Sequence, residues 1–222
     1  MQSLSKPRPI SVILLEDHQA IREMIATFIQ SVPGFVMQGD YGDARSALQA
    51  CQEGKPDLLI ADLMMNGFTG LDLLTELHRA GALPRTLVFT ANTSQLAIER
   101  ALSLGVLGYI EKTASFAEFK KAMMAVSEGR PHLGPKTLIQ TRQIVARGGR
   151  TALSPREQSI LKLIAEGQSS KSIADILKIS QGTVESHRGN ISRRTGLHSV
   201  AEFTLLAIEL GLIEAPQRLQ SS

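Results

Sequence analysis

Short apolar runs alternate with amphipathic stretches through the first half of the chain, and this alternation limits the folds available to it. The apolar runs are typical of buried strands and comprise Ile10–Leu15, Phe35–Gln38, Leu58–Ala61, Thr86–Phe89 and Gly108–Ile110. The stretches that follow them repeat apolar residues at helical spacing and comprise Ala20–Ile29, Ala44–Gln52, Leu71–Ala80, Leu96–Leu104 and Phe116–Val126. Apolar strands that alternate with helices predict a parallel sheet covered on both faces, and right-handed crossovers make it a doubly wound α/β fold. The first helix is expected to have a broad apolar face formed by two rows, Ala20, Met24 and Phe28, and Ile21, Ile25 and Ile29.

The composition supports packed cores and more than one domain. The chain has 222 residues, of which 43% are hydrophobic and 20% charged, so wholesale disorder is not expected. No apolar run approaches the roughly 20 residues of a membrane helix, and the first residues lack the apolar middle of a secretion signal. We therefore expect a cytoplasmic protein with no membrane partner. The single cysteine, Cys51, is expected to be a packed thiol in a reducing compartment.

The charges are unevenly distributed along the chain. Counting Lys and Arg against Asp and Glu, residues 1–126 carry −2, residues 127–150 carry +4 and residues 151–222 carry +1. This asymmetry points to a polyanionic partner for the second half.

Ionisable or hydroxyl side chains follow four of the five predicted strands. In chain order, they are Glu16 and Asp17, then Asp62, then Thr90, which precedes Ala91, and finally Lys112. In a doubly wound sheet these strand ends lie at one edge, where ligands bind. Two carboxylates about 4 Å apart repel by roughly 4 kcal/mol at an effective dielectric near 20, and a bound Mg²⁺ relieves that repulsion. A structural alternative stays open, in which Asp17 caps the helix that begins near Ala20.

This edge is suited to a phosphoryl group as well as to Mg²⁺. Asp62 is expected to attack phosphorus, while Lys112 and the cation neutralise the charge that moves. The Thr90 hydroxyl is expected to hydrogen-bond a phosphoryl oxygen.

Four motifs in this part of the chain, LLEDH, IADLMM, VFTA and GYIEK, resemble those of the bacterial receiver domain of two-component response regulators over about residues 8–128. The resemblance implies a flavodoxin-like fold and phosphorylation of Asp62 by a sensor histidine kinase. It also implies that Mg²⁺ is held by Asp17, Asp62 and the backbone carbonyl of Met64, with Glu16 acting through water or through its charge.

The same resemblance implies a conformational switch. Tyr109 matches the family's switch aromatic, which turns inward when the Thr90 hydroxyl engages the phosphoryl group, and Ala91 belongs to the same set. Asn66 departs from the family pattern because receivers usually have proline there. Without the fixed φ of proline, the turn after Asp62 is expected to be looser, which bears on metal affinity and phosphoryl lifetime.

The second half of the chain predicts a linker followed by a small all-α domain. Pro and Gly at both ends of residues 129–150 indicate the linker, with one short helix over Thr137–Ala146. Ser154-Pro155-Arg156-Glu157 predicts a helix that starts with a capping box and ends at Gly167. Three further helices are expected, opened by Ser170, capped by Ser180 and spanning Ser199–Leu210. The expected domains are thus a receiver over residues 1–128 and a helical domain over residues 151–222.

The pieces LSPRE, SKSIA, TVESH and GLI resemble the LuxR/NarL/FixJ helix-turn-helix over about residues 152–213. Val184 and Ile191 are expected to face the bundle, so the other side of the third helix points outward into the major groove of double-stranded DNA. Residues expected at the DNA, through bases or phosphates, are Lys171, Thr183, Glu185, Ser186, Arg188, Gly189, Arg193 and Arg194. Glu185 stands where many family members have lysine and is able to accept a hydrogen bond from cytosine.

A net charge of +1 on the helical domain suggests weak binding as a monomer, so we expect a homodimer on paired half-sites. Four residues of the last helix are candidates for the dimer contact, with core packing as an open alternative: Leu205, Leu206, Ile208 and Leu210.

Together the two halves predict a phosphorylation-dependent transcription regulator. It is expected to accept a phosphoryl group on Asp62 and lose it slowly, without being a turnover enzyme. A phosphatase with an aspartyl nucleophile is disfavoured because such enzymes need a second acid where this chain has Met64. The expected partners are DNA, a sensor histidine kinase, a second copy when phosphorylated, and RNA polymerase. The alternative is a DNA-binding regulator whose receiver is a dimerisation module that is never phosphorylated.

Overall fold

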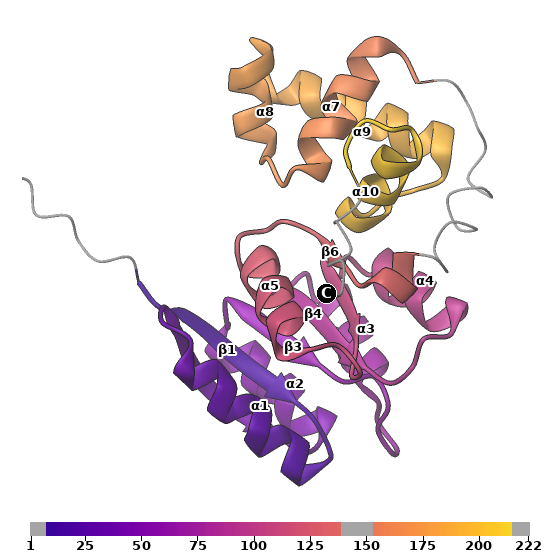
Figure 1. Cartoon of the computed structure of the whole chain (residues 1–222). Coiled ribbons are helices and arrows are strands. Elements are labelled where there is room, and N and C mark those ends of the chain that lie inside the picture. Colours follow the sequence, from indigo (N-terminus) through magenta and orange to yellow (C-terminus); the bar gives the residue numbers. More distant parts are fainter. Residues whose placement is uncertain (1–7, 139–152, 215–222) are drawn as a thin grey trace, which may run out of the picture. The chain divides into compact units, whose positions relative to one another are not determined.

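The computed structural model describes residues 8–138 and 153–214 (Figure 1). The chain forms two compact units, residues 1–91 and 92–222. None of the helices within the described ranges has the length and apolar character needed to cross a membrane.

A six-stranded sheet has the strand order β2-β1-β3-β4-β5-β6. Its strands are β1 (Ile10–Leu15), β2 (Phe35–Tyr41), β3 (Leu58–Ala61), β4 (Arg85–Thr90), β5 (Gly108–Glu111) and β6 (His132–Leu133). β1 pairs in parallel with both β2 and β3. The strand order therefore reverses direction at β1 and β3, which is the topological switch point where doubly wound sheets bind ligands. This arrangement confirms the expected α/β doubly wound fold.

Helices alternate with the strands as the sequence predicts. In the first unit they are α1 (Gln19–Ser31), α2 (Ala44–Gly54) and α3 (Gly70–Arg79), and in the second α4 (Gln95–Ser103) and α5 (Phe116–Ser127). Their bounds lie within two residues of the expected ones. In α1 only one of the two expected apolar rows is buried, since Ile25 and Ile29 are inaccessible while Met24 is 48% exposed. The apolar face of α1 is therefore narrower than expected.

The strands differ from the expectation at several ends. β2 continues through residues 39–41, β4 is one residue longer at each end, and β5 continues to Glu111. The register of β2 with β1 shifts between Val12 and Ile13. Because β2 is an edge strand, polar residues can continue it without being buried. The two-residue β6 was not expected, since so short a strand has no periodicity to reveal it.

The helical domain contains α7 (Pro155–Ala165), α8 (Ser170–Leu177), α9 (Gln181–Thr195) and α10 (Val200–Glu209). The expected capping box of Ser154 with Glu157 is present at the start of α7. Ser180 caps α9 by accepting from the Thr183 N–H. These contacts confirm the predicted all-α domain.

Three further expectations concern the Cys51 thiol, the apolar residues of α10 and the linker. Cys51 is 1% exposed, and burial raises the pKa of its thiol to about 12, so the packed thiol is confirmed. Leu205 and Leu206 are buried whereas Leu210 is 46% exposed, so a dimer role for this group stays a prediction. The linker helix expected over Thr137–Ala146 lies outside the described residues beyond position 138, and the domain boundaries stay a prediction.

Candidate functional site

Two carboxylates and an imidazole gather where β1 ends. Glu16 and Asp17 directly follow β1, and His18 precedes α1. One ligand atom from each of the three lies within 4.8 Å of the others. Glu16 is 1% exposed, whereas Asp17 and His18 are accessible. Carboxylate oxygens are the donors that Mg²⁺ prefers, so this set fits a divalent cation.

The structure rejects the alternative that Asp17 caps α1. The N-cap residue is His18, and no side-chain cap hydrogen bond forms among the described residues at this helix start. Asp17 Oδ1 lies 2.8 Å from His18 Nδ1 instead. The Asp17 carboxylate therefore stays beside Glu16, where a cation can reach both.

Arg22 fixes the loop that carries these acids. Its Nη1 donates to the Glu16 carbonyl at 2.7 Å, and its Nε lies 3.4 Å from Asp40 Oδ2. Sequence reasoning missed this residue, because a single arginine in the first turns of a helix gives no signal of its tertiary partner. The contact holds the Glu16 backbone between α1 and β2.

Asp62 lies beside this acidic cluster at the end of the neighbouring strand. Its backbone N–H donates to the Leu15 carbonyl at 2.9 Å, which extends the pairing of β1 with β3. Its side chain is buried, and its Oδ1 accepts from the Met64 N–H at 2.9 Å. The structure thus places Asp62 at the end of the strand next to the one that Glu16 and Asp17 follow.

Gly70, at the start of α3, shapes the backbone behind Asp62. A Cβ added at Gly70 would lie 1.9 Å from the Asp62 carbonyl oxygen, a distance that no side chain tolerates. A residue with any side chain therefore cannot occupy position 70 unless the loop after Asp62 moves. The sequence contains this glycine, but only the fold reveals why it is needed.

A pocket beside Asp17 is lined by Met65, Asn66 and Phe68. Arg45 lines it as well, and its guanidinium lies 4.8 Å from the centre of the Phe68 ring. Asn66, which stands where receivers usually have proline, therefore lines the same pocket as Asp17.

The remaining expected residues follow the next two strands of the sheet. Thr90 is the last residue of β4 and is fully buried, and Ala91 follows it at an exposed position. Lys112 comes directly after β5. Tyr109, within β5, is fully buried and its hydroxyl donates to the Asn92 carbonyl at 2.5 Å. Tyr109 therefore lies inward, which is the position that the resemblance assigns to the phosphorylated state.

The outward side of α9 carries the polar residues expected at DNA. Glu185, Ser186, Gly189 and Arg193 are exposed, whereas Val184 and Ile191 are buried as expected. Thr183 near the start of α9 and Lys171 in α8 are exposed as well. Arg188 is more covered, with 27% of its side chain exposed.

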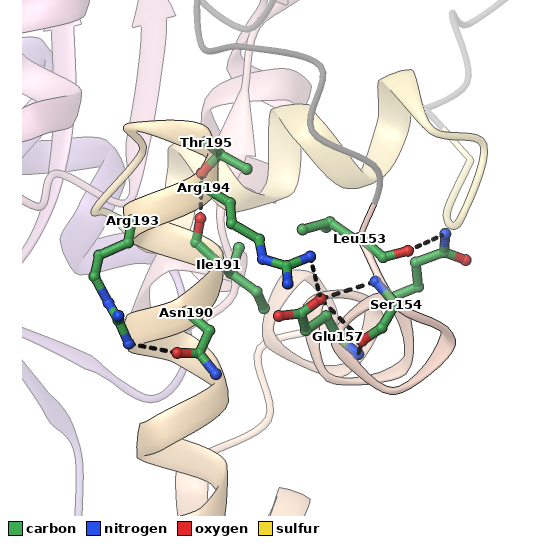
Figure 2. A network of polar contacts seen from close by, with 9 residues as sticks. Leu153, Ser154, Glu157, Asn190, Ile191, Arg193, Arg194 and Thr195 are labelled. Atoms are coloured by element: carbon green, nitrogen blue, oxygen red, sulfur yellow. Dashed lines mark hydrogen bonds and ion pairs between the residues drawn. The ribbon is translucent and has the colours of Figure 1, made fainter.

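Arg194 has a partner inside the domain, as Figure 2 shows. Its Nη1 lies 3.4 Å from Oε2 of Glu157, a side chain of α7 that is 4% exposed. The same oxygen accepts from the Ser154 N–H at 2.8 Å and the Ser154 hydroxyl at 2.9 Å. Burial alone would raise the pKa of Glu157, but the Ser154 hydrogen bonds, Arg194 and the nearby His187 hold that pKa below its usual value. Arg194 therefore fixes the end of α9 to the start of α7.

Two family descriptions match the chain. The response regulator receiver domain matches residues 12–124, and the luxR family of bacterial regulatory proteins matches residues 151–207.

Individual proteins match most of the chain. The transcriptional regulatory protein LiaR of Bacillus subtilis is 31% identical over 187 residues, which cover 82% of this chain and 89% of LiaR. The response regulator protein VraR of Staphylococcus aureus is 28% identical over 207 residues, which cover 92% of this chain and 99% of VraR. The crystal structure of the response regulator ChrA, from a heme-sensing two-component system, has a TM-score of 0.51 and 29% identity, and the match covers 92% of this chain and 99% of ChrA.

Proposed function

The chain belongs to the bacterial response regulators that join a receiver domain to a LuxR-type DNA-binding domain, and we propose that phosphorylation of Asp62 controls its binding to DNA. Members of this family are DNA-binding transcription regulators rather than turnover enzymes. The proposed phosphodonor in the cell is a sensor histidine kinase.

The observation that carries the proposal is the position of Asp62 beside Glu16 and Asp17. A buried carboxylate at the switch point of the sheet, next to two further acids, is suited to a divalent cation and a phosphoryl group. In the proposed site Asp17, Asp62 and the Met64 carbonyl hold Mg²⁺, with Glu16 acting through water or its charge. When bound, Mg²⁺ neutralises charge on the phosphoryl oxygens.

The chain's own residues have distinct roles in this proposal. Asp62 supplies the nucleophilic carboxylate oxygen, and Arg22 fixes the Glu16 backbone beside it. Lys112 supplies a positive charge to the phosphoryl oxygens, and the Thr90 hydroxyl donates a hydrogen bond to one of them. The backbone at Ala91 and the ring of Tyr109 respond to that contact.

The helical domain supplies the output. The proposed DNA contacts are Lys171, Thr183, Glu185, Ser186, Arg188, Gly189, Arg193 and Arg194, on or next to the exposed side of α9. The proposed division of the chain is a receiver over residues 1–128, a linker over 129–150 and the DNA-binding domain over 151–222. The regulator is proposed to act in the cytoplasm as a homodimer when phosphorylated, with RNA polymerase as a further partner.

One observation favours the alternative of a receiver that works without phosphorylation. Tyr109 is buried, and its hydroxyl donates to the Asn92 carbonyl. A contact within the chain therefore holds the ring inward, so the ring depends less on a phosphoryl group for this position. The intact set of Asp17, Asp62, Thr90 and Lys112 supports the main proposal instead.

Labelling with a small phosphodonor tests the assignment. Incubation with acetyl phosphate and Mg²⁺ is expected to add one phosphoryl group to the parent protein and none to Asp62→Asn, as measured by intact mass. Asp175→Asn, a change of the same kind at an exposed position of α8, is the matched control and should be labelled like the parent. Equal labelling of Asp62→Asn and the parent would refute the assignment. If the parent takes up no phosphoryl group and binds DNA equally with and without acetyl phosphate, the alternative function is the correct one.

A further inference from the structure

Two oppositely charged side chains on the exposed side of α9 are held together by a serine of α8. Ser170 Oγ donates to Glu185 Oε1 at 2.5 Å, and Arg188 Nη1 donates to the same hydroxyl at 3.3 Å. Arg188 Nε also lies 3.9 Å from Glu185 Oε2. Glu185, Arg188 and Ser170 thus form one connected group, here named the Ser170 clamp.

The clamp is chemically consistent and orients both charged groups. A serine hydroxyl has one proton to donate and lone pairs to accept, so it can serve Glu185 and Arg188 at once. Ser170 is the first residue of α8, where the positive end of the helix dipole favours a carboxylate. Both side chains therefore lose less freedom on binding DNA than mobile ones would.

The clamp leaves hydrogen-bonding capacity toward solvent. The Glu185 side chain is 54% exposed, and its two carboxylate oxygens have more lone pairs than the clamp uses. The guanidinium of Arg188 carries five N–H groups, only some of which point to Ser170 and Glu185. An acceptor and a donor therefore stand side by side on α9.

Gly189 adds clearance next to this pair. It lies one turn after Glu185, and a Cβ built there would meet no heavy atom of the described residues within 4 Å. Glycine inside a helix is less favourable than alanine, and internal packing does not require it at this position. Ser186, the neighbouring exposed residue, has its hydroxyl bonded to the Gly182 carbonyl of its own helix. Because Gly189 has no side chain, another molecule can approach the helix backbone beside the Ser170 clamp.

We propose that Glu185 and Arg188 read cytosine and guanine in the major groove, with Ser170 as the positioning residue and Gly189 giving the bases room. Cytosine presents an N4 amino donor there, which suits a carboxylate, and guanine presents the O6 and N7 acceptors, which suit a guanidinium. The negative charge of Glu185 repels phosphates, so its place on this side of α9 is explained by a contact with a base. The inference rests on the DNA-binding function and names the bases that this function selects.

Selection from a randomised double-stranded DNA library tests the base preference. The full chain, treated with acetyl phosphate and Mg²⁺, is expected to enrich sites with a cytosine or guanine at fixed positions. Glu185→Gln keeps the shape of the side chain but removes its charge. The preference for cytosine at one position should therefore fall about 10-fold or more. Binding to unrelated DNA should rise, because the side chain no longer repels phosphates. Glu166→Gln removes the same charge from the exposed end of α7 and should leave the selected sequence unchanged.

Two further variants separate base reading from folding. Ser170→Ala should weaken binding to the selected site several-fold and leave binding to unrelated DNA unchanged. Gly189→Ala should raise the thermal stability of the helical domain yet weaken binding to the selected site about 10-fold, which a purely structural glycine would not do.

The outcomes distinguish this inference from the functions on which it rests. If Glu185→Gln selects the same cytosine as the parent, or if Gly189→Ala binds the selected site as tightly, the inference is overturned while DNA binding stands. Retention of no DNA by the parent would overturn the DNA-binding function and the inference together. DNA binding that is indifferent to acetyl phosphate would refute only the control by phosphorylation.

Discussion

Glu157 on α7 and Arg194 on α9 form an ion pair at 3.4 Å in which the carboxylate is almost fully buried. The same carboxylate closes the capping box with Ser154, so one side chain joins the start of α7 to the end of α9 (Figure 2). Removing one partner of a buried pair leaves the other without compensation. The pair therefore holds α9 in its position within the helical domain.

Arg194→Met should destabilise the helical domain by about 1–3 kcal/mol, because Glu157 loses its charged partner but keeps the Ser154 hydrogen bonds. Hydrogen exchange at the amides of α7 and α9 measures this loss of stability in the helical domain alone. Arg193→Met is the matched control, since its guanidinium bonds Asn190 on the same exposed helix. Equal exchange in the two variants would show that the Glu157 contact does not stabilise the domain.

The stability of the helical domain should depend on pH through Glu157. The folded-state pKa of this group lies below its ordinary value of 4.5. Its contribution is therefore complete above about pH 4.5 and is lost as the pH falls through the lower folded-state pKa. We expect the stability difference between the parent and Glu157→Gln, measured by hydrogen exchange of α9, to shrink as the pH is lowered through this window. A difference that stays constant or grows would contradict the assignment.

Glu111 ties residues beyond β6 to the end of β5. Its Oε1 accepts from the Thr137 N–H at 3.2 Å and from the Thr137 hydroxyl at 3.4 Å, and both residues are buried. Glu111→Ala should cost about 1–3 kcal/mol because it removes the buried acceptor of the Thr137 N–H, whereas Glu111→Gln keeps an acceptor and should cost less. Urea unfolding measures the loss of stability in each of the two variants. Hydrogen exchange at residues 132–138 shows whether that loss lies next to the Glu111 contact. Equal losses in the two variants would mean that the hydrogen bond is not the cause.

Gly70→Ala should disturb the loop that follows Asp62. The new methyl group would lie 1.9 Å from the Asp62 carbonyl oxygen, so the loop must move at a cost of about 1–3 kcal/mol. Labelling by acetyl phosphate should fall, while Gly189→Ala, where the Cβ meets open space, should be labelled like the parent. Normal labelling and unchanged stability of Gly70→Ala would show that the loop tolerates the shift.

Local patterns predicted much of the fold. The bounds of β1 and β3 follow from continuous apolar runs, and the start of α7 follows from its capping box. Edge strands carry weaker patterns, so the polar end of β2 and the two residues of β6 escaped prediction. Met24 shows the limit of helical spacing, since an apolar residue in the correct period is 48% exposed.

The candidate site was predicted in composition but not in detail. Motif order identified Glu16, Asp17 and Asp62, because strand ends in a parallel sheet lie at one edge. The alternative role of Asp17 as a helix cap is rejected by the structure, because His18 occupies the N-cap position. The contacts of Arg22 with Glu16 and of Arg194 with Glu157 depend on how separate segments of the chain pack together. The spacing of residues in the sequence does not reveal such packing.

The most direct test of the central claim is the affinity for DNA before and after treatment with acetyl phosphate and Mg²⁺. A fluorescent duplex from the selected library, titrated with the parent and with Asp62→Asn at one salt concentration, provides it. We expect treatment to tighten binding by the parent at least 10-fold and to leave Asp62→Asn unchanged. An equal response of the two proteins, or no response of the parent despite phosphoryl labelling, would contradict control through Asp62.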